Sequence, residues 1–402
     1  MAKRREIRDR DITGLKYVDR LLPMLGALHD VGCARDKAGN RRLHLDEYCL
    51  LVLLFLFNPI VRSLRGLQQA SQLKNVQKKL GCARASLGSL SEATDVFDPE
   101  RLVGILETLL ADVPEHGDVG RGQVRQALTA VDGSVVKTLA SLAEAAYLRD
   151  KNGGQHCGWR FHTHFAIDRG VPTRMDVTPA VQSGKSEEKQ LLRLCLQSDH
   201  CYVLDRWYAQ FTLWNDIVAA GSSYVCRIRD NSNLERVVEE RPPSKEAREA
   251  GVLRDIVVTL GGKGHVPDHP VRVILVQTTP HQKTGGRKGG TAGPPSDGVL
   301  RIATNLLDVP AEVIADIYRH RWTIELFFRF FKHVLGCRHL LSTDPVGIQI
   351  QAYCAIIACL LIHLWTGGKP SLRTYEMVCF YLWGWADLEE LTSHLSTLQP
   401  VT

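Results

Sequence analysis

The chain has 402 residues, 44% of them hydrophobic, which is enough for two or three domains with substantial cores. Its net charge of +6 is a mild basic excess, compatible with a polyanionic partner but weak support for nucleic acid on its own. The eleven cysteines are scattered and form no C-x-x-C pair, which argues against a disulfide framework or a structural zinc site and favours a reducing compartment.

Neither a secretory leader nor a membrane span is expected. The N-terminal sequence MAKRREIRDRD is charged, but no apolar segment follows it, so it lacks the pattern of a signal peptide. The most apolar stretches, residues 49–57 and 352–365, are too short to cross a bilayer and are expected to be buried helices. We therefore expect a soluble cytoplasmic protein with no membrane partner.

Residues 1–120 are predicted to form an N-terminal helical domain. Apolar residues at helical spacing predict helices at 48–57, 61–80 and 98–109. The basic segment at 74–84 is compatible with DNA binding, and we interpret the region as a DNA-binding domain. The alternative is a small helical domain with solvated lysines, which is the more common case.

Residues 121–230 are predicted to alternate strands and helices. The predicted strands occupy residues 127–131, 161–167, 173–177, 201–204 and 223–228. The second and third form a hairpin that turns at Asp168, and helices are expected after Ser186 and Asp205. This order is typical of an α/β layer with a mixed sheet.

Residues 231–298 break this alternation and are interpreted as a β-rich insertion. They contain two strand candidates, 253–259 and 271–277, and a basic, glycine-rich stretch at 283–298 that is predicted to be a flexible loop. The predicted organisation is therefore a helical domain at 1–120, an α/β domain at 121–230 and 299–345, the insertion at 231–298 and a C-terminal helical region at 346–402.

Four polar side chains are predicted to share one narrow strip of the helix that begins at Pro310. At about 100° per residue, an arc of only about 60° contains Tyr318, Arg321, Glu325 and Lys332. The carboxylate could hold a divalent cation, while the two cations and the phenol could bind phosphate oxygens. The alternative is a salt-bridged helix face, because Glu325 has arginines at positions i−4 and i+4.

Metal-assisted phosphoryl transfer needs more than one carboxylate, and two aspartates are suitably placed. Asp132 ends the first predicted strand in ALTAVDGS, and Asp205 ends a later one in CYVLDRWY. Carboxylates at the ends of neighbouring strands can converge, with Glu325 arriving from a packed helix. Each aspartate has a structural alternative, since Asp132 with Gly133 suits a turn and Asp205 suits a helix N-cap.

Together these residues resemble the DDE transposases of bacterial insertion sequences, in the branch with a Y-x2-R-x3-E-x6-K signature. The four residues of the strip match every spacing of that signature. The segment VLDRWYA resembles the second-aspartate motif of the family, D-R-G-Y, with Trp207 in place of the glycine. The resemblance covers most of residues 126–361 and is weaker outside them.

The resemblance implies a ribonuclease-H-like catalytic core, with Asp132 on its first strand, Asp205 on its fourth and Glu325 on a helix after the insertion. It also implies that these carboxylates hold two Mg²⁺ ions, for which Mn²⁺ can substitute. The implied reaction is cleavage at transposon ends followed by attack of the freed 3′-OH on target DNA. The tyrosine, arginine and lysine of the strip would bind phosphates of the end being cut.

Four further residues are weaker candidates for DNA contact. Arg227 and Arg229 alternate at the end of the strand predicted at 223–228, so they are expected to face the same side, toward either DNA or solvent. Trp207 and Trp322 could stack on an unpaired base, although we expect them to be core aromatics.

The sequence therefore predicts a DNA transposase that is cytoplasmic and associated with the nucleoid. Its predicted partners are double-stranded DNA, as both transposon ends and target, and a second copy of the chain in a homodimer. One alternative is a transposase derivative that binds DNA without catalysis, which a nicking assay would distinguish. The other is a stand-alone metal-dependent nuclease, which would cleave DNA but never join a 3′-OH to a target.

Overall fold

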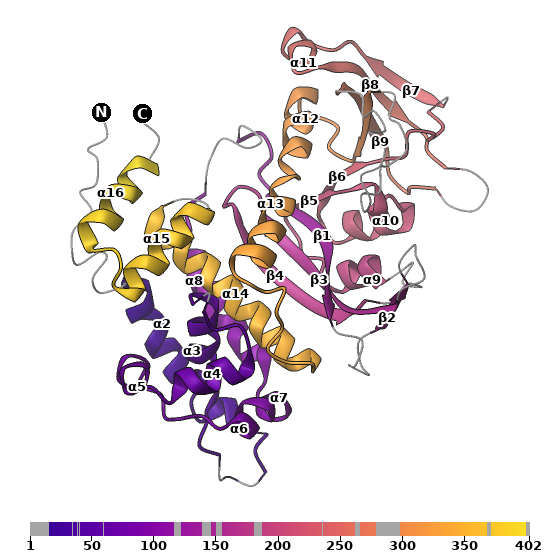
Figure 1. Ribbon diagram of the computed structural model, residues 1–402. Helices are drawn as coiled ribbons and strands as arrows, with labels where there is room; N and C mark the ends of the chain where they lie inside the picture. Colours follow the sequence, from indigo (N-terminus) through magenta and orange to yellow (C-terminus); the bar gives the residue numbers. More distant parts are fainter. Residues whose placement is uncertain are drawn as a thin grey trace.

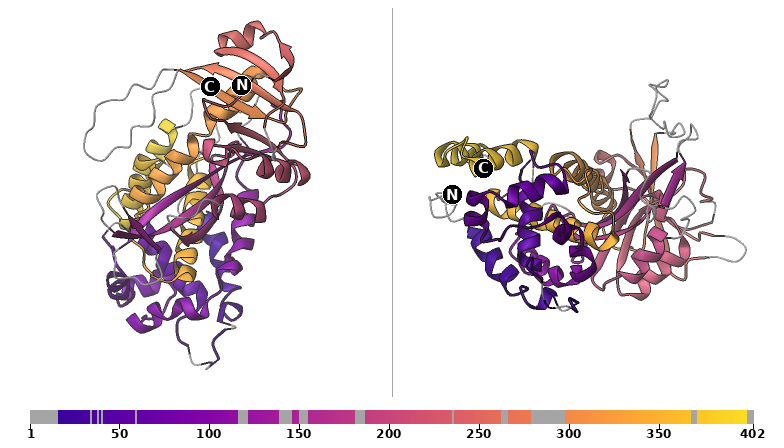
Figure 2. Two further views of the ribbon diagram at one scale, coloured as in Figure 1. Left: turned by 90° about the vertical axis from the view of Figure 1, so that its right-hand side faces the viewer. Right: turned by 60° about the horizontal axis from the view of Figure 1, so that its bottom comes forward.

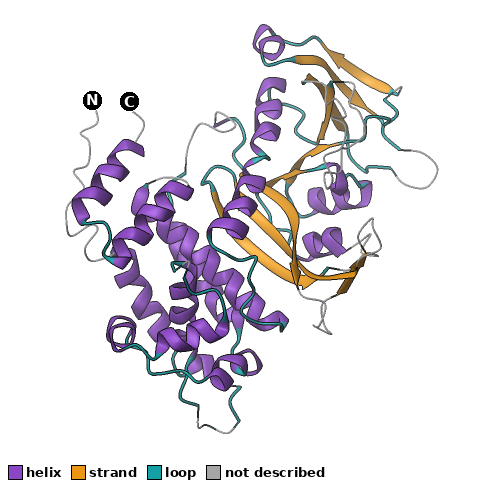
Figure 3. Cartoon of the chain, viewed as in Figure 1, coloured by secondary structure: helices purple, strands orange, loops and turns teal. Residues whose placement is uncertain are grey.

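A mixed ten-stranded sheet lies at the centre of the α/β part of the molecule, and the helices of both chain ends gather on one side of it (Figures 1 and 3). The structure is a computed structural model. It describes residues 16–33, 35–37, 39, 41–58, 60–115, 122–138, 146–149, 155–180, 187–234, 236–261, 266–278, 298–367 and 371–398. The predicted cap Ser186 and the loop residues 283–297 lie outside the described residues.

The sheet combines a parallel centre with antiparallel flanks. Its strands are β1 (Ala127–Thr138), β2 (Ala146–Arg149), β3 (Gln155–Ala166), β4 (Val171–Pro179), β5 (His200–Leu204), β6 (Ser223–Arg227), β7 (Val237–Arg241), β8 (Val252–Val258), β9 (Val271–Gln277) and β10 (Val299–Thr304). β5 lies parallel to both β1 and β6, whereas β1, β3 and β4 form an antiparallel meander. The predicted fold class, an α/β protein with a mixed ribonuclease-H-like sheet, is confirmed.

Alternate residues of the central strands face two different cores, as the two-residue period of a strand requires. Tyr202 and Tyr224 belong to one buried cluster, whereas their neighbours Val203 and Val225 belong to the other. The first face is covered by α9 (Glu187–Leu194) and α10 (Phe211–Ala219). The second is covered by α12 (Ala311–His320), α13 (Thr323–Arg329) and α14 (Pro345–Thr366).

The remaining helices of the two chain ends pack into one layer beside this second face (Figure 2). They are α2 (Lys16–Gly26), α3 (Leu45–Leu56), α4 (Leu64–Ser71), α5 (Lys74–Leu80), α6 (Leu87–Ser91), α7 (Ala93–Val96), α8 (Val103–Ala111), α15 (Leu372–Trp383) and α16 (Leu388–Leu398), with short turns η1 (Val31–Cys33) and η2 (Pro99–Leu102). One buried core runs from α3 and α8 through α14 to β1 and β4. The domain boundaries therefore stay predictions, because among the described residues this core runs across them.

α14 is the central helix of this layer. By length and composition its 22 residues could cross a membrane, but 83% of its most apolar window is buried inside the protein. It packs on α3, α8 and β4, and this packing accounts for its apolar composition. The prediction of a buried helix at 352–365 is confirmed, although the helix is longer than the apolar stretch that indicated it.

The stretch predicted as one helix at 61–80 is divided into two, and the predicted C-terminal helical region also contains separate helices. Residues 61–80 form α4 and α5, and the side-chain amide of Gln77 donates to the carbonyl of Ser71 at 2.8 Å, which satisfies the end of α4. The C-terminal stretch at 372–395 forms α15 and α16, because Gly384 ends α15 with a left-handed φ of 76°. Local hydrogen bonding at the helix ends decided both cases.

The helix that begins after Pro310 is also not uniform. Its backbone bonds shorten to the i−3 type around Arg321 and Trp322, between α12 and α13. It then widens into a π-helical turn, η5 (Phe330–Val334). The strip predicted on one regular helix is therefore carried by three consecutive helical segments.

The predicted insertion extends the main sheet instead of forming a separate one. β7, β8 and β9 continue the sheet through β10, and the short helix α11 (Lys245–Glu249) joins β7 to β8. The strands predicted at 253–259 and 271–277 are confirmed to within one residue as β8 and β9. β7 was not predicted, because its sequence VVEER is mostly exposed and lacks a buried face.

A buried ion pair holds the insertion to the helix that follows it. Arg272 of β9 donates to both carboxylate oxygens of Asp255 on β8, at 2.8 and 2.7 Å, and the two side chains are only 3% and 6% exposed. The same guanidinium donates to the carbonyls of Leu306 and Leu307, each at 3.1 Å. These carbonyls precede α12, so Arg272 joins the extended sheet to the start of the helix that carries Tyr318.

We predict that Asp255→Ala lowers the free energy of unfolding by about 3–5 kcal/mol, because it leaves the buried Arg272 charge without its carboxylate. Urea denaturation followed by circular dichroism measures the change. The matched control is Glu240→Ala, which removes an exposed ion pair with Arg254 and should cost less than about 1 kcal/mol. Equal effects of the two substitutions would contradict a structural role for the Arg272 pair.

Candidate functional site

Asp132 and Asp205 lie side by side where the parallel pairing of β1 and β5 ends. The last pair in that register is Val131 with Leu204, so the next residue of each chain segment is an aspartate. Side-chain alternation directs both toward the face covered by α13. The prediction that Asp132 ends its strand is wrong, because β1 continues to Thr138 through its pairing with β3.

The environment of Asp132 disfavours its charged form. The side chain is 23% exposed, and burial, together with the nearby Asp205 carboxylate, raises the pKa of Asp132 to about 7. Arg321 and the backbone N–H of Gly133, which donates to Asp132 at 2.8 Å, act in the opposite direction. Two carboxylates held this close repel each other unless a cation lies between them.

The third carboxylate reaches this point from α13, which packs against β1. Arg321 lies between the carboxylates, with Nη2 2.7 Å from Oε1 of Glu325 and Nη1 3.8 Å from Oδ2 of Asp132. The salt-bridged helix face considered as an alternative is thus present in part. It extends beyond the helix, because the same arginine also faces an aspartate on the sheet.

Lys332 and Tyr318 complete the cluster. The ammonium of Lys332 donates to the carbonyl of Val135 on β1 at 2.7 Å, and burial lowers its pKa although Asp132 opposes the change. Burial raises the pKa of Tyr318 to about 12, and the Arg321 charge opposes this. The irregular helix therefore still brings all four residues of the predicted strip to the carboxylate pair.

Arg227 and Arg229 are not arranged as predicted. β6 ends at Arg227, so Arg229 lies beyond the strand and the two do not share a strand face. Arg227 contacts Asp230 at 3.4 Å and is close enough to Tyr318 to lower its pKa, whereas Arg229 is exposed. Only Arg227 borders the cluster.

The expectation that Trp207 and Trp322 are core aromatics is wrong. They are 47% and 52% exposed. The Trp207 backbone N–H donates to Oδ1 of Asp205 at 2.8 Å, and the Lys189 ammonium lies 5.1 Å from the centre of its ring. Trp207 has no positive φ, so the backbone here does not require the glycine of the family motif. Asp205 therefore caps the helical turn that follows it, as its structural alternative predicted. It also belongs to the carboxylate cluster.

Sequence reasoning missed a fourth carboxylate, Glu188 of α9. It forms an ion pair with Arg160 of β3 and is close enough to Asp132 to raise its pKa. A Cβ atom on Gly133 would lie 2.7 Å from Oε1 of Glu188, so the glycine leaves the room that this carboxylate occupies. No sequence signal separates Glu188 from its neighbour Glu187, since both suit the first turn of a helix.

The set of donors suits a hard divalent cation. Asp132, Asp205 and Glu325 each offer carboxylate oxygens as ligands. Such oxygen sets are typical of Mg²⁺ and Mn²⁺. The surrounding cations and the phenol are suited to anionic oxygens of a substrate.

Comparison with known proteins places residues 125–361 in the family described as "Transposase DDE domain". A putative transposase y4zB of Sinorhizobium fredii (strain NBRC 101917 / NGR234) is 27% identical over 215 residues, which cover 53% of this chain and 55% of that protein. A probable transposase for insertion sequence element IS5377 of Geobacillus stearothermophilus is 24% identical over 227 residues, covering 56% and 54%. The chain thus matches only about half the length of these relatives.

A shorter and more similar match is found in a putative transposase for insertion sequence element IS4SA of Synechocystis sp. (strain ATCC 27184 / PCC 6803 / Kazusa), which is 43% identical over 82 residues, 19% of this chain and 24% of that protein. Among solved structures, the cryo-EM structure of a piggyBac transposase synaptic complex with hairpin DNA aligns with 94% of this chain and 80% of its own, at 10% identity and a TM-score of 0.43.

The raised pKa of Asp132 predicts a pH dependence of stability in protein freed of metal with EDTA. The folded protein retains a proton that the unfolded chain loses above its ordinary pKa of 3.8, so this contribution to stability disappears as pH rises toward 7. Between pH 5 and 7.5, wild type should lose up to about 3 kcal/mol relative to Asp132→Asn. Urea denaturation of both proteins across this range measures the difference.

Comparing wild type with Asp132→Asn cancels the effect of other titrating groups on the pH dependence of stability. Burial lowers the pKa of His162 and of His164 to about 4, which gives stability that is lost as pH falls from about 6.5 toward 4. Both proteins share this opposite trend, so it cancels. Parallel stability curves for the two proteins would contradict the raised pKa of Asp132.

Proposed function

Because this chain belongs to the family of DDE transposases, we propose that it is a DNA transposase that cleaves transposon ends and joins the freed 3′-OH to target DNA. The observation that carries this proposal is the convergence of Asp132, Asp205 and Glu325, from β1, β5 and α13, on one point bordered by cations. The spacing of the helix residues favours the branch of the family with the Y-x2-R-x3-E-x6-K signature.

The three carboxylates are proposed to hold two Mg²⁺ ions, or Mn²⁺ in their place. The oxygen-only donor set and the mutual repulsion of Asp132 and Asp205 support this. Bound divalent cations would supply activation of the attacking oxygen and stabilisation of the leaving oxygen. Protein groups would do the rest by positioning the phosphate and balancing its charge.

Tyr318, Arg321 and Lys332 are proposed to hold phosphates of the DNA end. Arg321 neutralises Glu325 and Asp132 in the free protein, and it becomes available to a phosphate once those carboxylates bind metal. Lys332 uses one of its three donors on the Val135 carbonyl and keeps two for phosphate oxygens. One observation supports this role for all three side chains: each lies beside Asp132 or Asp205.

We also propose the wider setting of the reaction. The partners are double-stranded transposon ends and target DNA, the active form is a homodimer across paired ends, and the N-terminal helices contribute to DNA binding. Arg227 and Arg229 are weaker candidates for that binding, of which Arg227 is the better placed. The protein would act in the cytoplasm at the nucleoid.

We predict that Asp132→Ala, Asp205→Ala and Glu325→Ala each reduce Mg²⁺-dependent cleavage of transposon-end DNA by at least about 10³-fold, because several kcal/mol of transition-state stabilisation is lost. End binding measured by gel shift should persist. The matched control is Asp216→Asn, a carboxylate on α10 that pairs with Arg193 away from the site; it should cleave normally. Undiminished cleavage by any one of the three variants would exclude that residue from the catalytic set.

Two assays on the wild-type chain separate the proposal from its alternatives. A DNA-binding derivative without catalysis would shift end DNA in a gel but would not nick it with Mg²⁺ or Mn²⁺. A stand-alone nuclease would nick it but would not join a pre-cleaved 3′-OH end to a second duplex. The proposed transposase does both.

For Lys332→Ala we expect weaker binding of the terminus and cleavage at displaced positions, because one phosphate contact near the reacting bond is lost. Sequencing of the cut ends, alongside affinity for an end duplex, gives both quantities. Lys245→Ala, which removes an exposed lysine of α11, controls for the loss of one positive charge and should leave the cut position unchanged. Wild-type affinity together with the wild-type cut position in Lys332→Ala would argue against a phosphate contact.

A further inference from the structure

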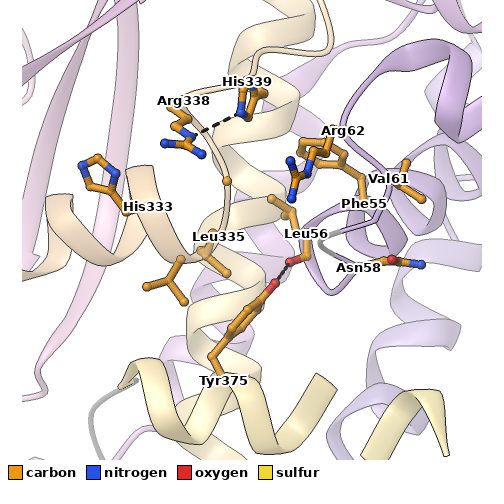
Figure 4. A pocket seen from close by; sticks show the side chains of 12 residues that line it. Phe55, Leu56, Asn58, Val61, Arg62, His333, Leu335, Arg338, His339 and Tyr375 are labelled. Carbon is orange, nitrogen blue, oxygen red and sulfur yellow. Dashed lines mark hydrogen bonds between the residues drawn. The ribbon is translucent and has the colours of Figure 1, made fainter. Parts of the chain in front are cut away.

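A second group of cations surrounds a cavity of about 130 Å³ that the proposed active site does not use (Figure 4). Its polar lining residues are Asn58, Arg62, His333, Arg338, His339 and Tyr375. None of the described residues that line it is acidic. We call this cavity the cationic pocket; its volume far exceeds the roughly 10–15 Å³ that one water molecule needs.

Three segments far apart in the sequence form the cationic pocket. Arg62 lies between α3 and α4, His333 lies in η5, and Tyr375 lies in α15. The floor is fixed by a hydrogen bond of 2.6 Å from the Tyr375 hydroxyl to the carbonyl of Leu56. Because that bond is buried, the pocket is already shaped before a ligand arrives, which reduces the cost of binding.

The cationic pocket continues directly from the strip of the proposed active site. His333 is the residue after Lys332 in the same π-helical turn. The backbone N–H of Arg338 donates to the carbonyl of Lys332 at 3.4 Å. The residues that follow Lys332 therefore form one wall of this pocket.

The arginines and the histidine of the pocket influence one another through a hydrogen bond and through charge. Arg338 Nε donates to Nε2 of His339 at 3.2 Å, which requires that nitrogen to be an unprotonated acceptor. Burial lowers the pKa of His339, and the charges of Arg338 and Arg62 lower it further. Arg62, Arg338 and His339 are all solvent-exposed, so an anion can reach them.

We propose that the cationic pocket binds one backbone phosphate of DNA, through the guanidinium groups of Arg62 and Arg338. This inference rests on the proposed function, since it extends the DNA path of that site. A phosphodiester carries a single charge and two free oxygens, which suits the paired donors of guanidinium groups. Binding there would connect the N-terminal helices, through Arg62, to the DNA held at Lys332.

The salt dependence of DNA binding tests the pocket without reference to catalysis. Affinity of a transposon-end duplex is measured by fluorescence anisotropy in EDTA, at several salt concentrations, for Arg62→Gln, Arg338→Gln and the double variant. Each single variant should bind roughly tenfold more weakly at 0.1 M salt, and the slope of log K against log salt should fall by about 1. Because both arginines share one phosphate, the double variant should lose little more than either single one.

Two control variants accompany these measurements. Arg373→Gln removes an exposed arginine of α15 that pairs with Glu376, and its slope should equal that of wild type. Arg338→Lys keeps the charge and should keep most of the slope. Circular dichroism of every variant tests whether the fold is kept. If Arg338→Gln lowers the slope of log K against log salt and Arg338→Lys does not, the change is due to the lost charge.

The source of the phosphate is tested with inorganic phosphate as the probe. Free phosphate should bind in calorimetry only weakly, in the millimolar range, and Arg338→Gln should abolish that binding. Tight binding of free phosphate with an unchanged DNA slope would mean that the pocket serves a small anion, and would overturn the proposal. Wild-type slopes in both single variants would overturn it as well.

Failure of this inference is distinguishable from failure of the proposed function. The slopes are measured without metal, so they do not depend on cleavage. If the carboxylate variants lose cleavage while the pocket variants keep their slopes, only the pocket is rejected. If the reverse occurs, the pocket binds DNA but the catalytic assignment is rejected.

Discussion

The parallel register of β1 and β5 is the constraint on which the rest of the site depends. It pairs Val131 with Leu204 and so places two carboxylates next to each other at the sheet. Burial, together with this proximity, raises the pKa of Asp132, and Arg321 from the helix opposite offsets the cost. Glu325 is held in the same network by the same guanidinium. The sheet therefore sets the position of the two negative charges, and Arg321 on the helix supplies the positive charge that balances them.

The placement of that balancing helix depends in turn on the extended sheet. β7, β8 and β9 lie far from the carboxylates, yet Arg272 joins them to the loop that leads into α12. A buried arginine needs several acceptors, and here the acceptors are the Asp255 carboxylate and the backbone before the helix. Residues between Asp205 and Glu325 thus do more than separate the two segments that carry these carboxylates. They hold the second one in position against the first.

The sequence predicted the strands and the composition of the site better than the details of its geometry. Strands such as β5 and β6 were predictable, because short apolar runs bounded by polar residues are typical of buried strands. The length of β1 beyond Asp132 was not, since it depends on pairing with β3, a tertiary contact. Likewise Glu188 and the exposure of Trp207 depend on how α9 lies against the sheet. Local pattern identified the residues, and only packing determined their neighbours.

The π-helical turn η5 bears on how the length of this chain can change over evolution. A π-turn contains one residue more than the corresponding α-helical turn. Removing one residue of this turn before Lys332 would restore a regular helical turn and leave the segment beyond it in register, but Lys332 would change its position relative to Glu325. Lys332 and His333, which lie inside the turn, would then face different neighbours. Insertions and deletions are tolerated in surface loops, but here a change of length alters the position of a side chain in the cluster. The number of residues between Glu325 and Lys332 is thus a structural quantity, independent of which residues they are.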